Sequence, residues 1–155
     1  MHELLQRLQA VFPDQVRISE TLGQTVVAVE APQIAPVAAF LKDEGFRLLL
    51  DVTVVDYLHR KPRFDVVYEL YHLEERDWLR LHVGADGEDP EVPSIAGVFA
   101  SANWAERECF DLFGIRFKGH PDLRRILMPE DWQGHPLRKD YPLTGPAELP
   151  PLAHE

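Results

Sequence analysis

The sequence contains almost no cysteine. Cys109 is the single cysteine among 155 residues. The chain therefore cannot form an internal disulfide bond, and it cannot hold an iron–sulfur cluster or a structural zinc ion with several thiolates. Because Cys109 falls on the apolar side of a predicted helix, we interpret it as a core residue rather than a nucleophile.

Long apolar runs, an apparent leader and an excess of positive charge are also missing. The longest apolar stretches, such as residues 35–41, are far too short to cross a bilayer. The first residues do not show a basic segment followed by an apolar one, as a secretory signal would. With 16 basic and 26 acidic side chains the net charge is −10, which argues against binding to nucleic acid or to an anionic membrane. We therefore expect a cytosolic chain, unless another protein holds it at a membrane.

Motifs for catalysis and cofactor binding are absent as well. No Gly-x-Gly-x-x-Gly sequence or phosphate loop follows a predicted strand, so nucleotide binding is not expected. Glu106 and Glu108 lie two residues apart on a helix and point about 200° away from each other, so they cannot share one substrate atom as acid and base. His120 and His135 lack the close helical spacing of a His-Glu-x-x-His zinc site. The sequence predicts no metal, flavin or nucleotide in this chain.

What the sequence does contain is an alternation of helical and strand patterns that predicts a two-layer α+β domain. The expected order is helix, two strands, helix, three strands and helix, at residues 2–12, 16–18, 25–29, 32–45, 46–57, 64–73, 78–83 and 103–113. Short charged links predict a mixed, largely antiparallel sheet, and residues 84–93 are expected to form an acidic loop. In the first of the three strands, alternation places one set of residues on a common face: Leu48, Leu50, Val52 and Val54.

The last helix has clear boundaries in the sequence. Asn103 is suited to cap its start, and Gly114 is suited to the left-handed position that ends a helix. One face is apolar, formed by Ala105, Cys109, Leu112 and Phe113. We expect the charged residues to lie mostly on the other face: Glu106, Arg107, Glu108 and Asp111. Trp104, Phe110 and Phe113 are expected to pack in the core.

A long proline-punctuated run follows this helix. Prolines at 121, 129, 136, 142, 146, 150 and 151 leave no room for a helix or strand of ordinary length. The run nevertheless carries more apolar and aromatic side chains than a disordered tail. We predict an extended arm over residues 119–155 that buries side chains on a partner. The alternative is that the arm wraps around its own domain.

Residues 106–143 resemble the 30 kDa, C-type subunit of the proton-pumping NADH:quinone oxidoreductase known as respiratory complex I. The resemblance is carried by Glu106-Arg107-Glu108, by Asp111-Leu112-Phe113-Gly114-Ile115, by residues 119–132 and by Gly134-His135-Pro136-Leu137-Arg138-Lys139-Asp140-Tyr141-Pro142-Leu143. So long a run of specific residues is a far stronger signal than a short motif.

The resemblance implies a non-catalytic component in the peripheral arm of that hetero-oligomeric complex. It implies an α+β domain like that of the 30 kDa family at residues 1–118 and a docking arm at 119–155 within one structural unit. The docking arm would brace the D-type subunit, which holds the quinone site and is called the quinone-site subunit below. The complex as a whole uses FMN, iron–sulfur clusters and quinone, carried by its other components. The chain would be peripheral on the cytoplasmic side of the inner cell membrane, joined to the membrane only through the complex.

The residues expected at the family signature and partner interface are Glu106, Arg107, Glu108, Asp111, Gly114, His120, Leu123, Arg124, Arg125, Ile126, Leu127, Trp132, Arg138, Lys139, Asp140 and Tyr141. Within this set, the arginines at 124, 125 and 138 are expected to donate to carboxylates of a partner, because planar guanidinium groups suit such contacts.

Other functions remain open from the sequence. The chain could be the equivalent component of a related membrane-bound hydrogenase or of a ferredoxin-dependent complex. A free-standing enzyme using His120, His135 or Glu108 is a further alternative from a different class. Assembly defects in variants at these positions would favour the bracing function, whereas lost chemistry in an intact complex would favour catalysis.

Overall fold

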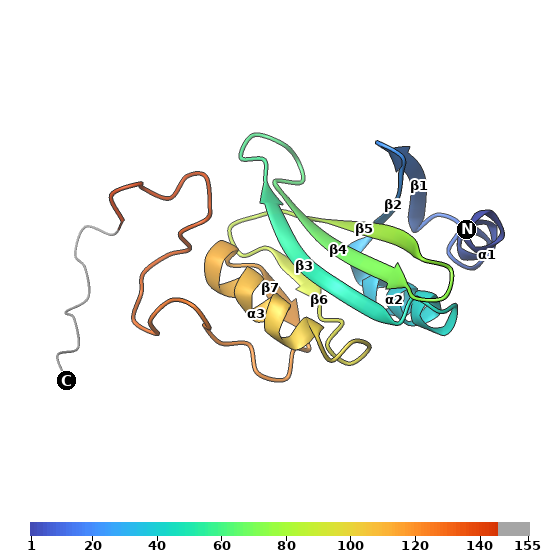
Figure 1. Ribbon diagram of the computed structural model, residues 1–155. Coiled ribbons are helices and arrows are strands. Elements are labelled where there is room, and N and C mark those ends of the chain that lie inside the picture. Colours follow the sequence, from blue (N-terminus) through green and yellow to red (C-terminus); the bar gives the residue numbers. More distant parts are fainter. Residues whose placement is uncertain (146–155) are drawn as a thin grey trace.

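A computed structural model of the chain describes residues 1–145. Its elements, shown in Figure 1, are α1 (His2–Val11), β1 (Val16–Thr21), β2 (Gln24–Val29), the 3-10 helix η1 (Ala31–Gln33), α2 (Ile34–Asp43), β3 (Leu48–Asp56), β4 (Phe64–His72), β5 (Asp77–Ala85), β6 (Glu91–Pro93), α3 (Ala102–Phe113) and β7 (Arg116–Lys118). No helix in residues 1–145 has both the length and the apolar character to cross a membrane.

The five longer strands form a single mixed sheet in the order β1-β2-β5-β4-β3. All neighbouring pairs are antiparallel except β2 and β5, which run parallel. That parallel pair is joined through α2 and two intervening strands, since a parallel connection needs a crossover. The predicted α+β class and the largely antiparallel sheet are confirmed.

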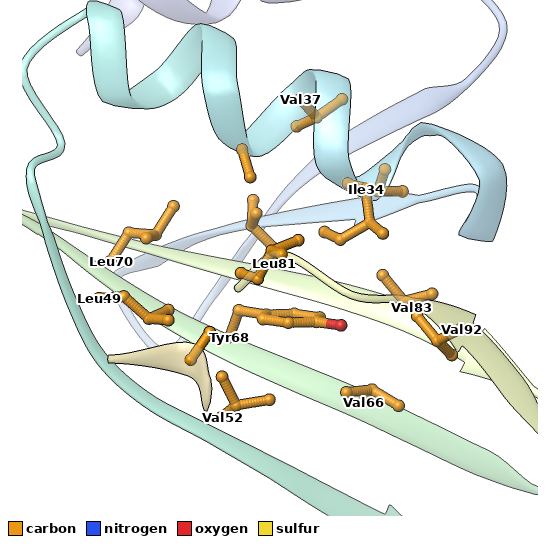
Figure 2. Packing of buried hydrophobic residues seen from close by; sticks show 14 of the residues in the cluster. Ile34, Val37, Leu49, Val52, Val66, Tyr68, Leu70, Leu81, Val83 and Val92 are labelled. Atoms are coloured by element: carbon orange, nitrogen blue, oxygen red, sulfur yellow. The ribbon is translucent and has the colours of Figure 1, made fainter. Parts of the chain in front are cut away.

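One face of this sheet carries the hydrophobic core. Helices α2 and α3 both pack on that face (Figure 1), and α3 contributes Ala102 and Cys109 to the same cluster of buried residues. In Figure 2, Ile34 and Val37 of α2 point toward Leu81 and Val83 of β5. Cys109 is buried, as predicted. The opposite face of the sheet is called the outer face below.

Strand β3 departs from simple alternation. Its pairing with β4 shifts between Leu49 and Asp51, so Leu50 is an extra residue of the kind found in a β-bulge. The extra residue moves the preceding side chains to the other face. Leu49 is therefore buried together with Val52 and Val54, whereas Leu48 and Leu50 are exposed. The prediction that Leu48 and Leu50 share a face with Val52 and Val54 is wrong for this reason.

A second, two-stranded sheet was not predicted. Strands β6 and β7 pair in parallel, with Val92 opposite Phe117, and both of these residues are buried. Strand β5 extends to Ala85 and β6 begins at Glu91, so the expected acidic loop over 84–93 is shorter than predicted. Three-residue strands show too little alternation to be recognised in a sequence.

Helix α3 begins earlier than its sequence indicates. Ser101 occupies the N-cap position and makes no capping hydrogen bond through its side chain. Asn103 lies inside the first turn, so the prediction that Asn103 caps the helix is wrong. The other boundary is confirmed, because Gly114 ends the helix in the left-handed conformation, with φ of 74°.

Residues 119–145 contain no helix or strand and run alongside α3 (Figure 1). We call this segment the arm. The remainder of the predicted arm, residues 146–155, lies outside the described residues.

Candidate functional site

The arm meets α3 at a buried carboxylate. The Asp111 side chain is fully buried and accepts hydrogen bonds from three consecutive arm amides. Its Oδ2 lies 3.0 Å from the Ile126 nitrogen, 2.7 Å from that of Leu127 and 2.8 Å from that of Met128. Arg125 completes the arrangement, with its Nη1 2.6 Å from Oδ1. We call these five residues the Asp111 cluster.

The hydrogen bonds in the Asp111 cluster are strong enough to keep the carboxyl ionised. Burial alone would raise the pKa of Asp111, but the hydrogen bonds from Met128, Arg125, Ile126 and Leu127 outweigh burial and lower it. Several backbone N–H groups pointing at one anion form a favourable concave site for negative charge. The Asp111 cluster therefore fixes the arm backbone by directional, charge-assisted contacts.

Arg125 joins separate parts of the arm to each other. In addition to Asp111, its guanidinium group donates to the carbonyl oxygens of Trp132 and Gly134, each at 2.9 Å. Arg107 of α3 is buried and donates in turn to the carbonyl oxygens of Arg124 and Arg125, at 3.3 and 3.2 Å. Two arginine side chains thus hold the backbone of an irregular segment.

The arm also donates hydrogen bonds to the last carbonyl groups of α3. The last carbonyl groups of a helix have no partner within the helix. Here the Asp111 carbonyl accepts from Nδ1 of His135 at 2.9 Å, the Leu112 carbonyl from the Leu137 nitrogen at 3.0 Å, and the Phe113 carbonyl from Nε of Arg138 at 2.5 Å. A cation at a helix C-terminus is favourable for the helix dipole as well.

Gly114 makes this contact possible. A Cβ atom at this position would lie 2.5 Å from a ring carbon of His135 and 2.6 Å from Nη2 of Arg138. Only a residue without a side chain lets the arm approach the helix end so closely, and the left-handed conformation favours glycine there.

A second buried carboxylate holds the far end of the arm. Asp56, at the end of β3, forms a two-fold hydrogen bond with Arg63, at 2.9 and 2.7 Å. The same guanidinium group binds both oxygens of Asp140, at 2.9 and 2.7 Å. The backbone nitrogen of Lys139 donates to Oδ2 of Asp56 at 2.8 Å. We call these four residues the Asp56 cluster. Chiefly through Arg63, the pKa values of both carboxyl groups are lowered.

A third buried carboxylate lies at the base of the arm. Glu106 of α3 is fully buried, and its carboxylate accepts from the Ser94 hydroxyl at 2.5 Å and the Ile95 nitrogen at 2.7 Å. Burial raises the pKa of Glu106 to about 7, against the lowering effect of these two hydrogen bonds. The His120 ring lies 3.9 Å from the same carboxylate.

Both ring nitrogens of His120 are already engaged. Nε2 lies 3.0 Å from the Asn103 carbonyl oxygen, which can only accept, and Nδ1 lies 3.0 Å from the Asp122 nitrogen, which can only donate. Nε2 therefore donates to the Asn103 carbonyl oxygen, and Nδ1 accepts from the backbone N–H of Asp122. A histidine with both nitrogens occupied in this way is poorly suited to exchange protons with a substrate.

The structure corrects several predictions about side-chain direction. Glu106, Arg107 and Asp111 are buried, not on an exposed polar face. The arm covers Arg107 and Asp111, whereas Glu106 is bound by Ser94 and Ile95, which precede α3. Glu108 is exposed, as predicted. Trp104 is 63% exposed, so the prediction that it packs in the core is wrong.

The arginine contacts also differ from those expected. Arg125 donates to a carboxylate and carbonyl groups of its own chain, and Arg138 donates to the Phe113 and Glu88 carbonyl oxygens. Arg124 is exposed and bound to Asp122 two residues away. The expectation that Arg125 and Arg138 reach carboxylates of a partner does not agree with these contacts.

Other signature residues take part in the same assembly. Leu123 packs against the core, and the Tyr141 hydroxyl donates to the Gln133 carbonyl oxygen at 3.1 Å. Sequence reasoning missed Asp56, Arg63 and Ser94. Asp56 carried a signal, because it continues the inward-facing series of Val52 and Val54, where a charged side chain needs a buried partner.

Several apolar side chains at this site remain uncovered. Leu127 and Leu137 are 61% and 52% exposed, and Leu143 is exposed as well. The Trp132 Nε1 atom is buried without a hydrogen-bond partner among the described residues.

Residues 1–145 contain no group of three or more histidine, cysteine or acidic side chains arranged to hold a metal ion.

Comparison with protein families gives a match over most of the chain. The family described as the 30 kDa subunit of respiratory-chain NADH dehydrogenase matches residues 27–147. Two curated relatives are each named as the C-type subunit of NADH-quinone oxidoreductase. That of Roseiflexus sp. strain RS-1 is 51% identical over 144 residues, with 90% of this chain and 83% of the relative covered. That of Geotalea uraniireducens strain Rf4 is 48% identical over 146 residues, with coverage of 93% and 89%.

Two solved structures share the fold. A trypsin-resistant fragment (1–134) of Nqo5 is 35% identical, with a TM-score of 0.69, over 79% of this chain and 98% of the fragment. A chain from the membrane-bound sulfane sulfur reductase, an archaeal respiratory membrane complex, is 22% identical with a TM-score of 0.79, over 92% and 85%. At that identity the second likeness concerns the fold alone.

Proposed function

Because the chain belongs to the family of the 30 kDa subunit of respiratory-chain NADH dehydrogenase, we propose that it is a structural component of a proton-translocating NADH:quinone oxidoreductase. In this proposal it stands in the peripheral arm of the complex, on the cytoplasmic side of the membrane, and braces the quinone-site subunit. Flavin, iron–sulfur clusters and quinone belong to other components. This chain supplies no catalytic residue.

One observation carries the proposal: contacts with its own domain hold the arm in place, and yet the arm leaves three leucine side chains exposed among charged ones. The Asp111 and Asp56 clusters hold its backbone through buried carboxylates, while Leu127 and Leu137 are left more than half exposed. Holding an irregular segment in one conformation costs conformational entropy. A partner that binds a pre-ordered segment does not have to supply that ordering energy, so its affinity increases.

Two further features support a partner on this side of the molecule. Trp104 of α3 is 63% exposed with the Arg107 guanidinium 5.0 Å from its ring. Tryptophan and arginine are enriched among the residues that dominate interface energies. Arg124 is the signature arginine whose guanidinium group is exposed, and its pair with Asp122 is a surface contact of small energy. Arg124 is therefore the arginine that we expect to meet a carboxylate of the quinone-site subunit.

The alternatives have less support. The likeness to the sulfane sulfur reductase chain is one of fold, and no contact within residues 1–145 favours that complex over an NADH-dependent one. A free-standing enzyme would need a reactive group that substrate can reach. Both nitrogens of His120 are engaged, and Nδ1 of His135 is bound to the Asp111 carbonyl oxygen. Of the three candidate residues, this leaves the exposed Glu108 as the one whose side chain makes no such contact within residues 1–145.

The proposal is tested by binding of the purified chain to the quinone-site subunit. We expect Leu127→Ser combined with Leu137→Ser to weaken binding by about tenfold or more, because truncating a central interface residue costs about 2 kcal/mol. Val11→Ser is the matched control, since Val11 is similarly exposed but lies on α1. Titration calorimetry gives the affinities, and thermal melting shows whether each variant is folded.

The result separates docking from simple folding. Normal melting with weakened binding supports the proposal. Full-strength binding by the folded double variant would contradict it, as would an equal loss in the Val11→Ser control.

A further inference from the structure

A group of exposed apolar side chains lies at the end of the sheet farthest from the arm. Leu48 of β3 is paired with Tyr71 of β4, and Tyr71 with Trp78 of β5, so the three side chains form a row on the outer face. The rings of Tyr71 and Trp78 are 5.0 Å apart. Trp78 is 51% exposed, and Leu50 and Leu73 are similarly exposed beside this row. We call these five residues the terminal patch.

The next row of side chains on the outer face is charged instead of apolar. Asp51, Glu69 and Arg80 stand opposite one another. Arg80 forms an ion pair with Glu69, which Gln24 of β2 also contacts. In this row, Glu69 and Arg80 are thus satisfied by contacts within the chain, as expected for a surface in water, whereas the terminal patch gathers several exposed apolar side chains.

Acidic side chains surround the terminal patch. Glu74, Glu75 and Asp77 belong to the β4–β5 turn or the first residue of β5, and Asp51 lies on β3. None of these four carboxylates forms an ion pair within residues 1–145. Arg47 and Arg76 are the nearby basic residues in the sequence. Met1 and Arg7 line a hollow together with Glu75 and Asp77, and Arg7 is paired there with Glu44. The four carboxylates still outnumber the positive groups that are not paired.

We propose that the terminal patch is a second docking surface, whose occupant is a positively charged segment with apolar side chains from a neighbouring protein of the complex. Trp78 and Tyr71 would bury against its apolar residues, and its lysines or arginines would meet Glu74, Glu75 and Asp77. Opposite charges across an interface favour this partner.

The same charges disfavour the other occupants. Two copies of this chain joined through their terminal patches would bring like charges together, which costs energy. An anionic lipid surface would be repelled for the same reason. A basic protein segment is the partner that satisfies both the apolar row and its acidic border.

The terminal patch and the arm lie at opposite ends of the same sheet. Strand β3 runs for nine residues from Leu48 at the patch to Asp56 at the arm, which corresponds to about 25–30 Å. Figure 1 shows the β4–β5 turn and the arm at opposite ends of the molecule. With a partner at each end, the rigid sheet would set the distance between two neighbouring proteins.

The test uses the assembled complex, and it rests on the proposed function only for the identity of that complex. A photo-crosslinking amino acid replaces Trp78 in one protein and Leu137 of the arm in another. After irradiation of the purified complex, mass spectrometry identifies the joined peptides. We expect position 78 to join a different protein from the one joined by position 137, through a segment in which lysine and arginine outnumber acidic residues.

Substitutions give a second measurement. Trp78→Ser with Leu48→Ser should lower the incorporation of this chain into the complex by about tenfold or more, because a large aromatic anchor is lost. Val55→Ser is the matched control, since Val55 is an exposed aliphatic residue on the same strand and outer face but away from the patch. Circular dichroism of the purified variants verifies that both are folded.

Several results would overturn the inference. These are normal incorporation of the folded double variant, and crosslinking from position 78 to lipid, to a second copy, to an acidic segment or to nothing. If position 137 alone formed no crosslink to another protein, that result would instead count against the proposed function of the arm. The two proposals can therefore be contradicted separately.

Discussion

The sheet domain and the arm are held together by different physics. The domain buries aliphatic and aromatic side chains between the sheet and its three α-helices, and burial of apolar area is largely independent of direction and pH. The arm is held chiefly by two buried carboxylates, those of Asp111 and Asp56, and by the groups that bind them. Such contacts depend on exact geometry and on protonation. Single substitutions should therefore distinguish the two regions.

The largest effect is expected at Asp111. Asp111→Ala removes the acceptor for three amides and leaves the guanidinium group of Arg125 unpaired in a mostly buried site. Breaking a buried ion pair by removing one partner costs roughly 3–5 kcal/mol. We expect this loss in urea unfolding, together with rapid hydrogen exchange at the amides of residues 126–128.

The core provides the comparison for that experiment. Leu81→Ala, at a fully buried core position of β5, should lower the free energy of unfolding by roughly 2–5 kcal/mol. In this variant, protection should fall throughout the domain instead of first at the arm. If Asp111→Ala also lowered protection evenly, the arm would not be a separate unit of stability and the comparison would break down.

The sequence predicted correctly those elements that bury only one of their faces. The strands of the main sheet were predicted because apolar residues alternate along them, and the end of α3 because Gly114 is suited to the left-handed conformation. It failed for Glu106, Arg107 and Asp111, since residues 94 and 95 and the arm cover the sides of α3 that the sheet leaves free. A helix whose second partner is polar looks the same in sequence as one that faces water.

The bulge in β3 is a second feature that the sequence does not predict. Nothing in the residues around Leu50 marks an extra residue, because the shift arises from pairing with β4. Similarly, the arginines of the arm look equally available in the sequence. Only the fold shows that Arg125 and Arg138 hold the chain itself while Arg124 remains exposed.

A smaller and pH-dependent effect is expected at Glu106. Its pKa of about 7 lies above the ordinary value of 4.5, so the folded protein binds this proton more tightly than the unfolded chain does. The resulting stabilisation is complete below about pH 4.5 and is lost as the pH rises through 7. The shift corresponds to at most about 3 kcal/mol, and we expect about 1–3 kcal/mol between pH 5 and pH 8.

Glu106→Gln isolates this contribution. The lowered pKa values of Asp56 and Asp111 act at lower pH, where their stabilisation is lost on acidification. The pKa of His135 is also lowered, so this residue opposes Glu106 as the pH falls below the ordinary value of 6.5, but it does so equally in both proteins. Denaturant unfolding at several pH values should show less loss of stability from pH 5 to pH 8 in the variant. Equal losses in the two proteins would contradict the assignment.

An effect of similar size to that at Glu106, but independent of pH, is expected at Gly114, where the helix and the arm touch. Gly114→Ala places a methyl group in a left-handed position and against His135 and Arg138, which should cost about 1–3 kcal/mol. Those two side chains cap the end of α3, so their displacement should loosen the arm while the sheet stays intact. We expect faster hydrogen exchange at Leu137, whose amide binds the Leu112 carbonyl, with unchanged exchange in β4 and β5. Gly97→Ala is the control, because a Cβ atom there meets nothing within 4 Å. Protection at Leu137 equal to that of the control would show that the arm does not depend on this close approach.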